Sequence, residues 1–166
     1  QLRNGLLGEN YSSKFSAYLS LGCVSPGFVY SKIKEKERKN NGTGPNRGTG
    51  HLIFELHVRD WFIYYTMKHN PRIFYQSGVV TRKDVTWRTD FELFDRWVNG
   101  ETGYPFIDAC MLELKHTGYM SNRGRQNVAS FLVFNLELDW RFGAEYFESV
   151  LIDHHVTANY GNWVHA

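Results

Sequence analysis

Apolar residues recur every three or four positions along most of the chain, which is the spacing of one face of an α-helix. Residues that begin or end helices separate the apolar segments: Ser25-Pro26, Asn70-Pro71, Gly100 and Thr117-Gly118. Pro is favoured at the first helical position and Gly just after the last, so these residues indicate the helix ends. The predicted helices span residues 26–39, 51–69, 89 or 90 to 99, 105–116, 121–137 and 142–151.

The segments between the predicted helices lack the signals of β-structure. Residues 40–50 are rich in Gly and Asn and contain one Pro, which favours a flexible loop. Residues 72–88 are expected to be irregular. The sequence shows no hairpin pattern and no repeat of 20–50 residues. We therefore predict an all-α fold, a helical bundle in which residues 1–166 form a single domain.

Composition adds a packed, aromatic-rich interior to this picture. Aromatic residues make up 16% of the 166 residues, which favours large rings packed in the core or stacked on a ligand. The net charge of +2 is too small to predict nucleic-acid binding, although a local basic patch would still allow it. The mixed-charge run at 32–39 reads as a solvated helix face rather than a nucleic-acid contact.

The cysteines and the chain ends bear on the cellular location. Cys23 and Cys110 have no metal-type spacing and are expected to be free, buried, reduced thiols, which fits an intracellular or organellar location. No apolar run reaches the roughly 18 residues that a membrane span needs. The chain begins with Gln1 and stops just after an aromatic-rich motif, so we expect it to be truncated at both ends.

A turn rich in hydroxyl groups precedes a helical segment near the amino terminus, and its polar residues are Ser12, Ser13, Lys14 and Ser16. Hydroxyl and backbone donors beside one cation suit a pyrophosphate group, particularly near a helix N-terminus. Serine-rich turns also cap helices, and the residues alone favour that simpler interpretation.

Two further sets of residues have an ordinary structural interpretation when only their types and spacing are considered. Glu55 and Arg59 are four residues apart on the predicted helix 51–69, so they share a face and would form a surface ion pair. Tryptophans at the separations of Trp87, Trp140 and Trp163 are ordinarily core residues.

The segment 118–163 combines paired arginines, two Asn-centred polar turns and two tryptophans. Burying such polar groups is costly unless they are paired, so a large planar ligand with polar edges would account for them. Asp153, His154 and His155 would be the residues of a metal site. Adjacent side chains on a helix point apart and no further ligand motif follows, so we predict no metal site.

Taken together, these segments resemble the FAD-binding helical region of the photolyase/cryptochrome family, most closely its DASH type. The resemblance runs from Leu2 to Trp163 and is most specific in residues 122–126 and 153–163. It implies an all-α domain with FAD as its cofactor. DASH-type relatives are often organellar, in a chloroplast or mitochondrion, which favours such a location here.

The resemblance assigns the FAD-binding residues by position. Ser12, Ser13, Lys14 and Ser16 match the segment that holds the FAD phosphates. Arg125 and Asp153 match the salt bridge beside the isoalloxazine ring, and Asn159 matches the residue facing its N5 edge. Arg59 and His155 occupy further positions around the cofactor.

The resemblance also assigns substrate-side and electron-transfer residues. Glu55 matches an acid that contacts a flipped-out pyrimidine pair, and Asn122 lies close to the same side. Trp163, Trp140 and Trp87 match the family's electron-transfer tryptophans, with Trp163 nearest the flavin.

Four positions depart from the family pattern. Val58 replaces a Trp that stacks on the substrate, which argues against pyrimidine-dimer repair because base–aromatic stacking contributes about 1–3 kcal/mol per base. His155 replaces a second Asp that hydrogen-bonds the flavin, so we expect weaker FAD binding. Leu112 and Phe134 replace basic residues and suggest an apolar surface for a protein partner.

Three functions follow from these observations. The first is a DASH-like flavoprotein domain in which blue light drives electron transfer along the tryptophans. The alternative is a degenerate homologue with little or no flavin that serves as a structural or interaction subunit of a larger assembly. The third is a DNA-repairing photolyase, against which Val58 and the modest charge argue.

Overall fold

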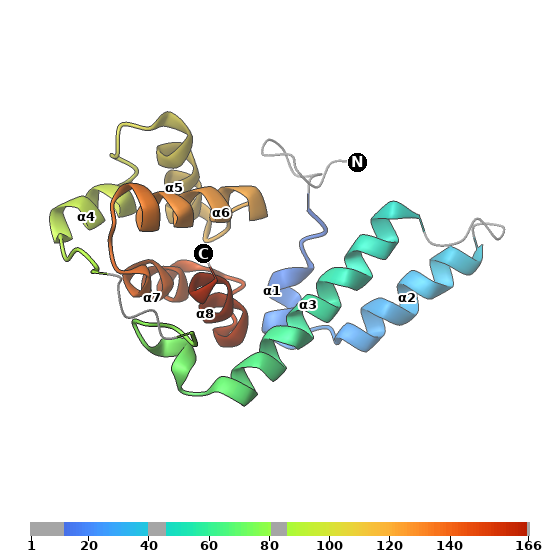
Figure 1. Cartoon of the computed structure of the whole chain (residues 1–166). Coiled ribbons are helices and arrows are strands. Elements are labelled where there is room, and N and C mark those ends of the chain that lie inside the picture. The colour runs from blue at the N-terminus through green and yellow to red at the C-terminus, as the bar shows by residue number, and fades with distance from the viewer. Residues whose placement is uncertain (1–11, 40–45, 81–85, 166) are drawn as a thin grey trace.

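The computed structural model describes residues 12–39, 46–80 and 86–165 (Figure 1). Within these residues the chain forms eight α-helices, two short turns of other helical types and no strand, which confirms the all-α prediction. The α-helices are α1 Phe15–Ser20, α2 Pro26–Lys39, α3 Arg47–His69, α4 Phe91–Asn99, α5 Pro105–Thr117, α6 Asn122–Ser130, α7 Trp140–Val150 and α8 Val156–Val164. The 3-10 turn η1 spans Arg72–Phe74 and the π-helical turn η2 spans Phe131–Asn135.

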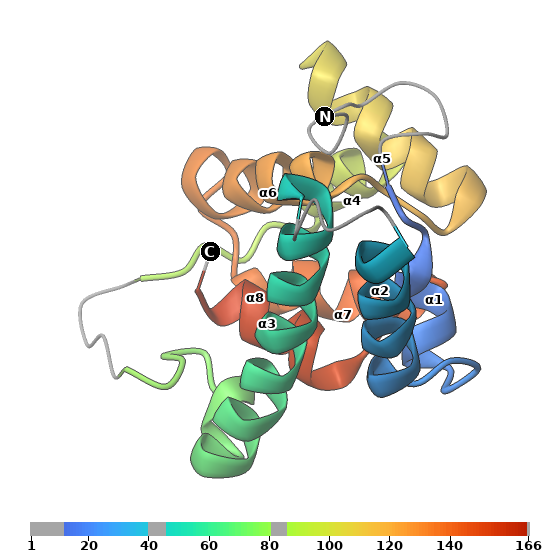
Figure 2. The ribbon, with the colours of Figure 1, turned by 90° about the vertical axis from the view of Figure 1, so that its right-hand side faces the viewer.

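Helix α8 lies between α3 and α7. Helices α2 and α3 pair on one side of the molecule, and α4 to α7 lie on the other (Figure 1). Helix α8 packs against both α3 and α7, and the view turned by 90° shows the same arrangement (Figure 2). The main hydrophobic core joins η1 with α4 to α8, and a smaller cluster of Val29, Ile33 and Leu56 holds α2 on α3.

Helix ends lie largely where the capping residues predict them. Ser25 accepts a hydrogen bond from the backbone N–H of Phe28 (3.1 Å) at the start of α2. The Asp90 side chain caps α4 through the N–H of Leu93 (3.0 Å). Gly100 and Gly118 follow α4 and α5 with φ of 67° and 66°, a left-handed conformation that favours glycine.

Several boundaries differ from the prediction because of local caps. Helix α3 begins at Arg47, inside the predicted loop, since the Asn46 side chain accepts from the N–H groups of residues 48 and 49. Helix α7 begins at Trp140 rather than at 142, because Asp139 caps it by accepting from the N–H of Arg141. Helix α8 was not predicted as a helix, since it has neither a Pro at its start nor a Gly after its end.

The predicted helix 121–137 is interrupted. Ser121 caps α6 as expected, but α6 ends at Ser130 and the wider turn η2 follows. The N–H of Leu136 donates to the Phe131 carbonyl (3.1 Å), and Glu137 takes a left-handed φ of 56°, which ends the helical run. Phe131–Val133 are all buried, because the π turn lets three successive side chains reach the core.

Two glycines admit aromatic rings against the helix backbone. A Cβ on Gly143 of α7 would overlap the Trp163 ring, and a Cβ on Gly161 of α8 would overlap the Phe62 ring of α3. Neither glycine has a positive φ, so the absence of a side chain rather than conformational freedom matters here. Helix α8 is thereby held closely on both neighbours.

The cysteines only partly match the prediction. Both are free, but Cys23 is exposed, and only Cys110 is buried, where burial raises the pKa of its thiol. Cys23 follows the short helix α1, so it lies in a surface turn and not in the core. Among the residues described, no helix is both long and apolar enough to cross a membrane.

Substitution of Gly143 by Ala should destabilise the protein. The new methyl group meets the Trp163 ring, and overpacking of this kind costs about 1–3 kcal/mol. Urea unfolding followed by circular dichroism measures the effect. Gly27→Ala is the matched control, since Gly27 lies in α2 with no atom within 4 Å of an added Cβ. Equal unfolding midpoints for Gly143→Ala and wild type would contradict the packing described.

Candidate functional site

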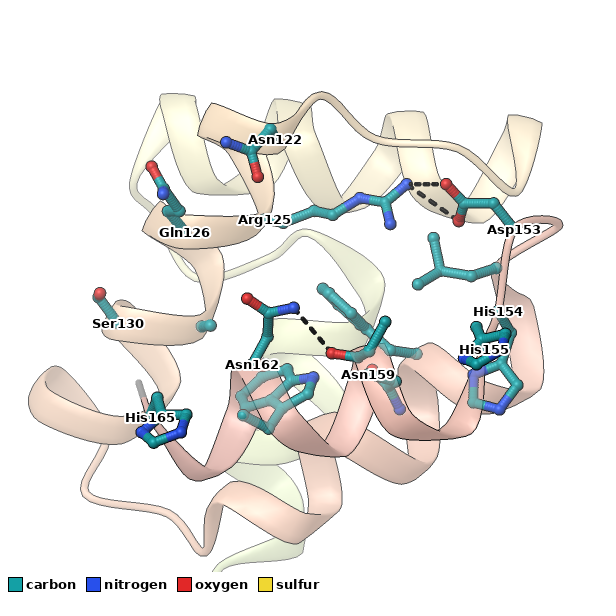
Figure 3. A pocket seen from close by; sticks show the side chains of 15 residues that line it. Asn122, Arg125, Gln126, Ser130, Asp153, His154, His155, Asn159, Asn162 and His165 are labelled. Carbon is teal, nitrogen blue, oxygen red and sulfur yellow. Dashed lines mark hydrogen bonds and ion pairs between the residues drawn. The ribbon is translucent and has the colours of Figure 1, made fainter. Parts of the chain in front are cut away.

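A cavity of about 350 Å³ lies between α6 and α8 (Figure 3). Asn122, Gln126 and Ser130 of α6 border one side, and Asn159, Asn162 and His165 of the α8 segment border the other. The remaining lining residues are Arg125, Ala129, Phe147, Leu151, Asp153, His154, His155, Ala158 and Trp163. Six of the predicted site residues therefore meet here: Asn122, Arg125, Asp153, His155, Asn159 and Trp163.

An ion pair between Arg125 and Asp153 closes one end of the cavity (Figure 3). Arg125 Nη2 donates to both carboxylate oxygens, at 2.8 and 3.1 Å, and its Nε donates to the Met120 carbonyl at 2.9 Å. The Asp153 side chain is only 3% exposed, whereas that of Arg125 is 26% exposed. Breaking one partner of such a pair leaves a buried charge unpaired, so the pair fixes the turn before α8 against α6.

The capped start of α6 orients Arg125. Ser121 is buried and its Oγ accepts from the N–H of Gly124 at 3.0 Å, so the first turn of α6 is fixed. Asn122 is exposed at the cavity edge, on the same first turn. The serine that precedes the Asn-Arg-Gly-Arg sequence therefore positions both the edge residue and the ion pair.

Asn159 and Trp163 lie one helical turn apart on α8 and share the face that lines the cavity. The Asn159 amide nitrogen donates to the Ala144 carbonyl of α7 (2.9 Å), which holds this buried side chain in place. The Trp163 ring packs edge-on against Phe147 with ring centroids 5.2 Å apart. A polar amide and a large aromatic ring thus lie side by side on the cavity surface.

His154 and His155 lie in the turn between α7 and α8, not on a helix as the prediction assumed. His155 Nδ1 is 3.0 Å from Thr157 Oγ1. Burial, the charge of Arg59 and the neighbouring His154 lower the pKa of His155, so its neutral form is favoured.

His154 was considered only as a metal ligand, and its place in the cavity lining was missed. Both of its ring nitrogens are buried without a hydrogen-bond partner in the described structure, and Nε2 is 3.8 Å from Glu148 Oε1. The described residues bring together no group of three His, Cys, Asp or Glu side chains suited to a metal ion. Because both nitrogens are buried, His154 lines the cavity through other atoms of the residue.

The predicted phosphate-binding segment is connected to the cavity through a residue that the prediction missed. None of Ser12, Ser13, Lys14 and Ser16 lines the cavity. Tyr119 links the two: its hydroxyl donates to Ser12 Oγ (2.9 Å), and Lys14 Nζ lies 4.0 Å from its ring centroid. The Arg125 guanidinium lies 5.4 Å from the same ring. An aromatic residue just before the Ser-Asn-Arg-Gly-Arg sequence is the signal that could have identified it.

The α3 residues are arranged differently from the predicted ion pair. Glu55 pairs with His51 Nε2 (2.8 Å) and Arg59 pairs with Asp60 (3.0 Å), so the described ion pairs do not include Glu55 with Arg59. The exposed carboxylate of Glu55 instead finds a partner one turn earlier. Arg59 acts on the cavity through its charge near His155.

The three predicted electron-transfer tryptophans share one core at different depths. Trp163 lines the cavity, and Trp140 is buried with its Nε1 donating to the Gln76 carbonyl (3.1 Å). Trp87 is half-buried against the same core. The N–H of Arg88 donates to the Glu137 carbonyl (3.0 Å), which holds the Trp87 segment beside the start of α7.

The residues of the cavity fit a planar cofactor with polar edges. Its volume lies within the range of about 300–1,000 Å³ that ligand pockets have. Trp163 and Phe147 supply apolar surface, whereas Arg125 and Asn159 supply polar contacts. This donor set matches an aromatic ring system that carries carbonyl oxygens and ring nitrogens along its edge.

Comparison with curated proteins identifies relatives that are longer than this chain. Cryptochrome DASH of Danio rerio is 51% identical over 166 residues, which cover 100% of this chain and 31% of that protein. Cryptochrome DASH, chloroplastic/mitochondrial, of Arabidopsis thaliana is 45% identical over 165 residues, covering 99% of this chain and 28% of that protein. The chain thus spans about a third of the length of these relatives.

Solved structures give the same result. A Synechocystis cryptochrome superposes with a TM-score of 0.94 at 50% identity, covering 99% of this chain and 33% of that one. A class III photolyase from Agrobacterium tumefaciens superposes with a TM-score of 0.82 at 30% identity, covering 94% of this chain and 31% of that one. The predicted helical architecture of this family is confirmed.

Residues 52–166 match the family described as the FAD binding domain of DNA photolyase, which takes in α8, most of α3 and the whole cavity lining. FAD is the cofactor that this match implies, as the sequence predicted. The chain belongs to the FAD-binding domain family of DNA photolyase, and its similarity is to the cryptochrome DASH proteins within that family.

Proposed function

We propose that this chain is a flavin-binding photoreceptor domain in which blue light drives electron transfer from tryptophan to FAD. The observation that carries the proposal is the cavity itself, where the Arg125–Asp153 pair, Asn159 and Trp163 face one space. An amide and an ion pair can hold the polar edge of a flavin, and an indole beside them can donate an electron. Cryptochrome DASH proteins and photolyases with the same helical architecture support this assignment.

FAD, when bound, would supply blue-light absorption and the capacity to accept one electron. Arg125 would donate hydrogen bonds to the flavin edge from a guanidinium that Asp153 and the Met120 carbonyl hold in place. Asn159, held against α7 by Ala144, would face the ring without a change of rotamer. These two side chains therefore orient the ring before it binds, which reduces the cost of ordering them.

The phosphates of FAD would lie toward the amino-terminal segment. Ser12 and Lys14 contact Tyr119, whose ring also contacts Arg125, so this segment lies beside the end of the cavity that the ion pair closes. Ser13 and Ser16 are exposed on either side of Lys14 and would add hydroxyl donors. Hydroxyl groups with a lysine beside them suit a pyrophosphate.

Trp163, Trp140 and Trp87 would carry the electron path from the cavity outward. Trp163 is 4% exposed and lines the cavity, Trp140 is 4% exposed in the core, and Trp87 is half-buried. Two buried rings followed by a half-buried one suit transfer of oxidising equivalents from the cofactor toward the surface. Burial also keeps water from the first two rings.

We do not propose DNA repair for this chain. Glu55, the residue expected on the substrate side, is exposed and paired with His51, and Asn122 is exposed at the cavity edge. Val58 offers an aliphatic side chain where stacking on a base would need an aromatic one. The exposed polar groups alone do not build a base-binding pocket.

A second candidate function, a protein contact without flavin chemistry, is favoured by Phe134. This side chain lies in η2 and is 67% exposed, and Leu112 of α5 is 39% exposed. An exposed phenylalanine on a rigid turn fits a site of contact with another protein. The two candidates differ in colour, since only the first binds a yellow cofactor.

We also propose an intracellular, organellar location. Cryptochrome DASH proteins of Solanum lycopersicum and Arabidopsis thaliana, at 47% and 45% identity, carry the description chloroplastic/mitochondrial. Other similar proteins carry no such description, so a fluorescent fusion of the full gene product would test the location.

The first test is the FAD content of the purified chain and its Arg125→Lys variant. Lysine keeps the charge but loses the two-pronged contact with Asp153, so FAD affinity should fall by about tenfold or more, equivalent to about 1.4 kcal/mol. Arg123→Lys is the control, since Arg123 lies on the same helix but outside the cavity lining. A folded, colourless wild-type protein would instead support the second candidate.

The second test follows light-driven loss of flavin absorbance in Trp163→Phe. Phenylalanine is far harder to oxidise than tryptophan, so the variant should retain FAD while photoreduction falls to near background. Trp61→Phe, an exposed ring of α3 outside the cavity, should photoreduce like the wild type. Undiminished photoreduction in Trp163→Phe would remove this ring from the electron path.

The third test uses the lowered pKa of His155. Unfolded histidine titrates near 6.5, whereas folding depresses this pKa, so the unfolded state binds more protons at mildly acidic pH. Stability is therefore expected to fall as the pH drops from about 7.5 to about 5.5. His155→Gln should flatten the dependence of the melting temperature on pH. Exposed His116→Gln should leave it unchanged.

A further inference from the structure

Tyr160 of α8 is a buried phenol with a carboxylate partner that the electron path described above does not use. The residue is 9% exposed, and its hydroxyl donates a hydrogen bond of 2.8 Å to Glu148 Oε2 of α7. A base within hydrogen-bond distance of the proton that it would accept meets the geometric requirement for proton transfer. The pair lies on the two helices that also carry Trp163 and Trp140.

The Tyr160 ring contacts one of the predicted electron-transfer residues. Its centroid lies 6.4 Å from that of Trp140, with the two rings near perpendicular at 78°. Phe74 covers another part of the ring at 4.7 Å, so water is kept away. Tyr160 is therefore the redox-active side chain in direct ring contact with Trp140 among the described residues.

The phenol stays protonated until it is oxidised. Burial and the hydrogen bond to Glu148 raise the pKa of Tyr160 well above its ordinary value of 10. A phenol that loses an electron becomes a very strong acid, so its oxidation needs a base already in place. Glu148 supplies that base, and its side chain is 46% exposed, so the proton can exchange with water.

We propose that Tyr160 and Glu148 act together as a proton-coupled electron donor to oxidised Trp140. One electron passes from the Tyr160 phenol to the indole radical cation of Trp140, while the phenolic proton moves along the hydrogen bond to the Glu148 carboxylate. The products are neutral Trp140, a neutral Tyr160 phenoxyl radical and a protonated Glu148. The role in light-driven chemistry rests on the proposed function, since the photoreaction is what oxidises Trp140.

Tyr146 provides an internal comparison. Its ring also contacts a tryptophan, Trp97, at 5.8 Å, and burial raises the pKa of its phenol. The hydrogen bonds of the described residues give its hydroxyl no carboxylate partner, unlike that of Tyr160. The two tyrosines thus share burial and a tryptophan neighbour and differ in the base.

The test oxidises tryptophan without FAD. A photo-excited ruthenium polypyridyl complex with a sacrificial electron acceptor serves as the one-electron oxidant of the 166-residue chain. Electron paramagnetic resonance and transient absorption then distinguish tyrosyl from tryptophanyl radicals. Wild type is compared with Tyr160→Phe, Glu148→Gln and the control Tyr146→Phe, with circular dichroism confirming that each variant is folded.

Tyr160→Phe should remove the tyrosyl signal. Glu148→Gln should lower the same signal by about tenfold or more, because glutamine accepts the hydrogen bond but not the proton. Tryptophanyl radicals should then live longer, and the wild-type decay should slow in D₂O. Tyr146→Phe should match the wild type. A full tyrosyl signal in Glu148→Gln, or no effect of Tyr160→Phe, overturns the proposal.

The same variants in FAD-loaded protein separate the proposed function from the proposed role of Tyr160 and Glu148. Absence of flavin photoreduction together with a Glu148-dependent tyrosyl signal from the external oxidant would reject the proposed function and support the Tyr160–Glu148 pair. If flavin photoreduction is normal and the tyrosyl signal of Tyr160→Phe equals that of the wild type, the proposed function is supported and the Tyr160–Glu148 pair is rejected.

Discussion

The close packing of α8 between α3 and α7 is the constraint on which the candidate site depends. Gly161 lies against the ring of Phe62 of α3, and the ring of Trp163 lies against Gly143 of α7. Each contact requires a residue without a Cβ, so two small positions determine where a helix of nine residues lies. Because α8 carries Asn159 and Trp163 into the cavity, this helix packing fixes the geometry that a ligand would meet.

The charge balance of the cavity follows from this arrangement. Asp153 is the one carboxylate in the lining, and Arg125 already engages it through two hydrogen bonds. Arg59 lowers the pKa of His155 through its charge, and this guanidinium is itself paired with Asp60 at 3.0 Å. A histidine at 155 thus changes the electrostatics of the site without removing its hydrogen-bonding capacity.

The sequence predicted best those features that a few neighbouring residues determine. Local signals were reliable: Ser25, Asp90 and Gly118 marked helix ends because capping is decided by a few neighbouring atoms. The interruption at 131–135 and the helical state of α8 were missed, because no Pro or Gly marks the end of α6 or either end of α8. Family resemblance placed six residues around the cavity, yet Tyr119 and His154 were missed since their roles appear only once Ser12 and the turn before α8 lie in place.

The departures from the family pattern divide the site into two sides. Val58 and Glu55 lie on α3, where a substrate would have to be recognised, and neither provides an aromatic surface or an unengaged acid. The proposed electron path lies on α7, α8 and the segment at 87–88, where Trp163 and Trp140 are buried. The packing of α8 on α3 includes the contact of Gly161 with the Phe62 ring, four residues along α3 from Val58. The proposed photochemistry therefore rests on residues of α7 and α8, and the doubt about DNA repair rests on residues of α3.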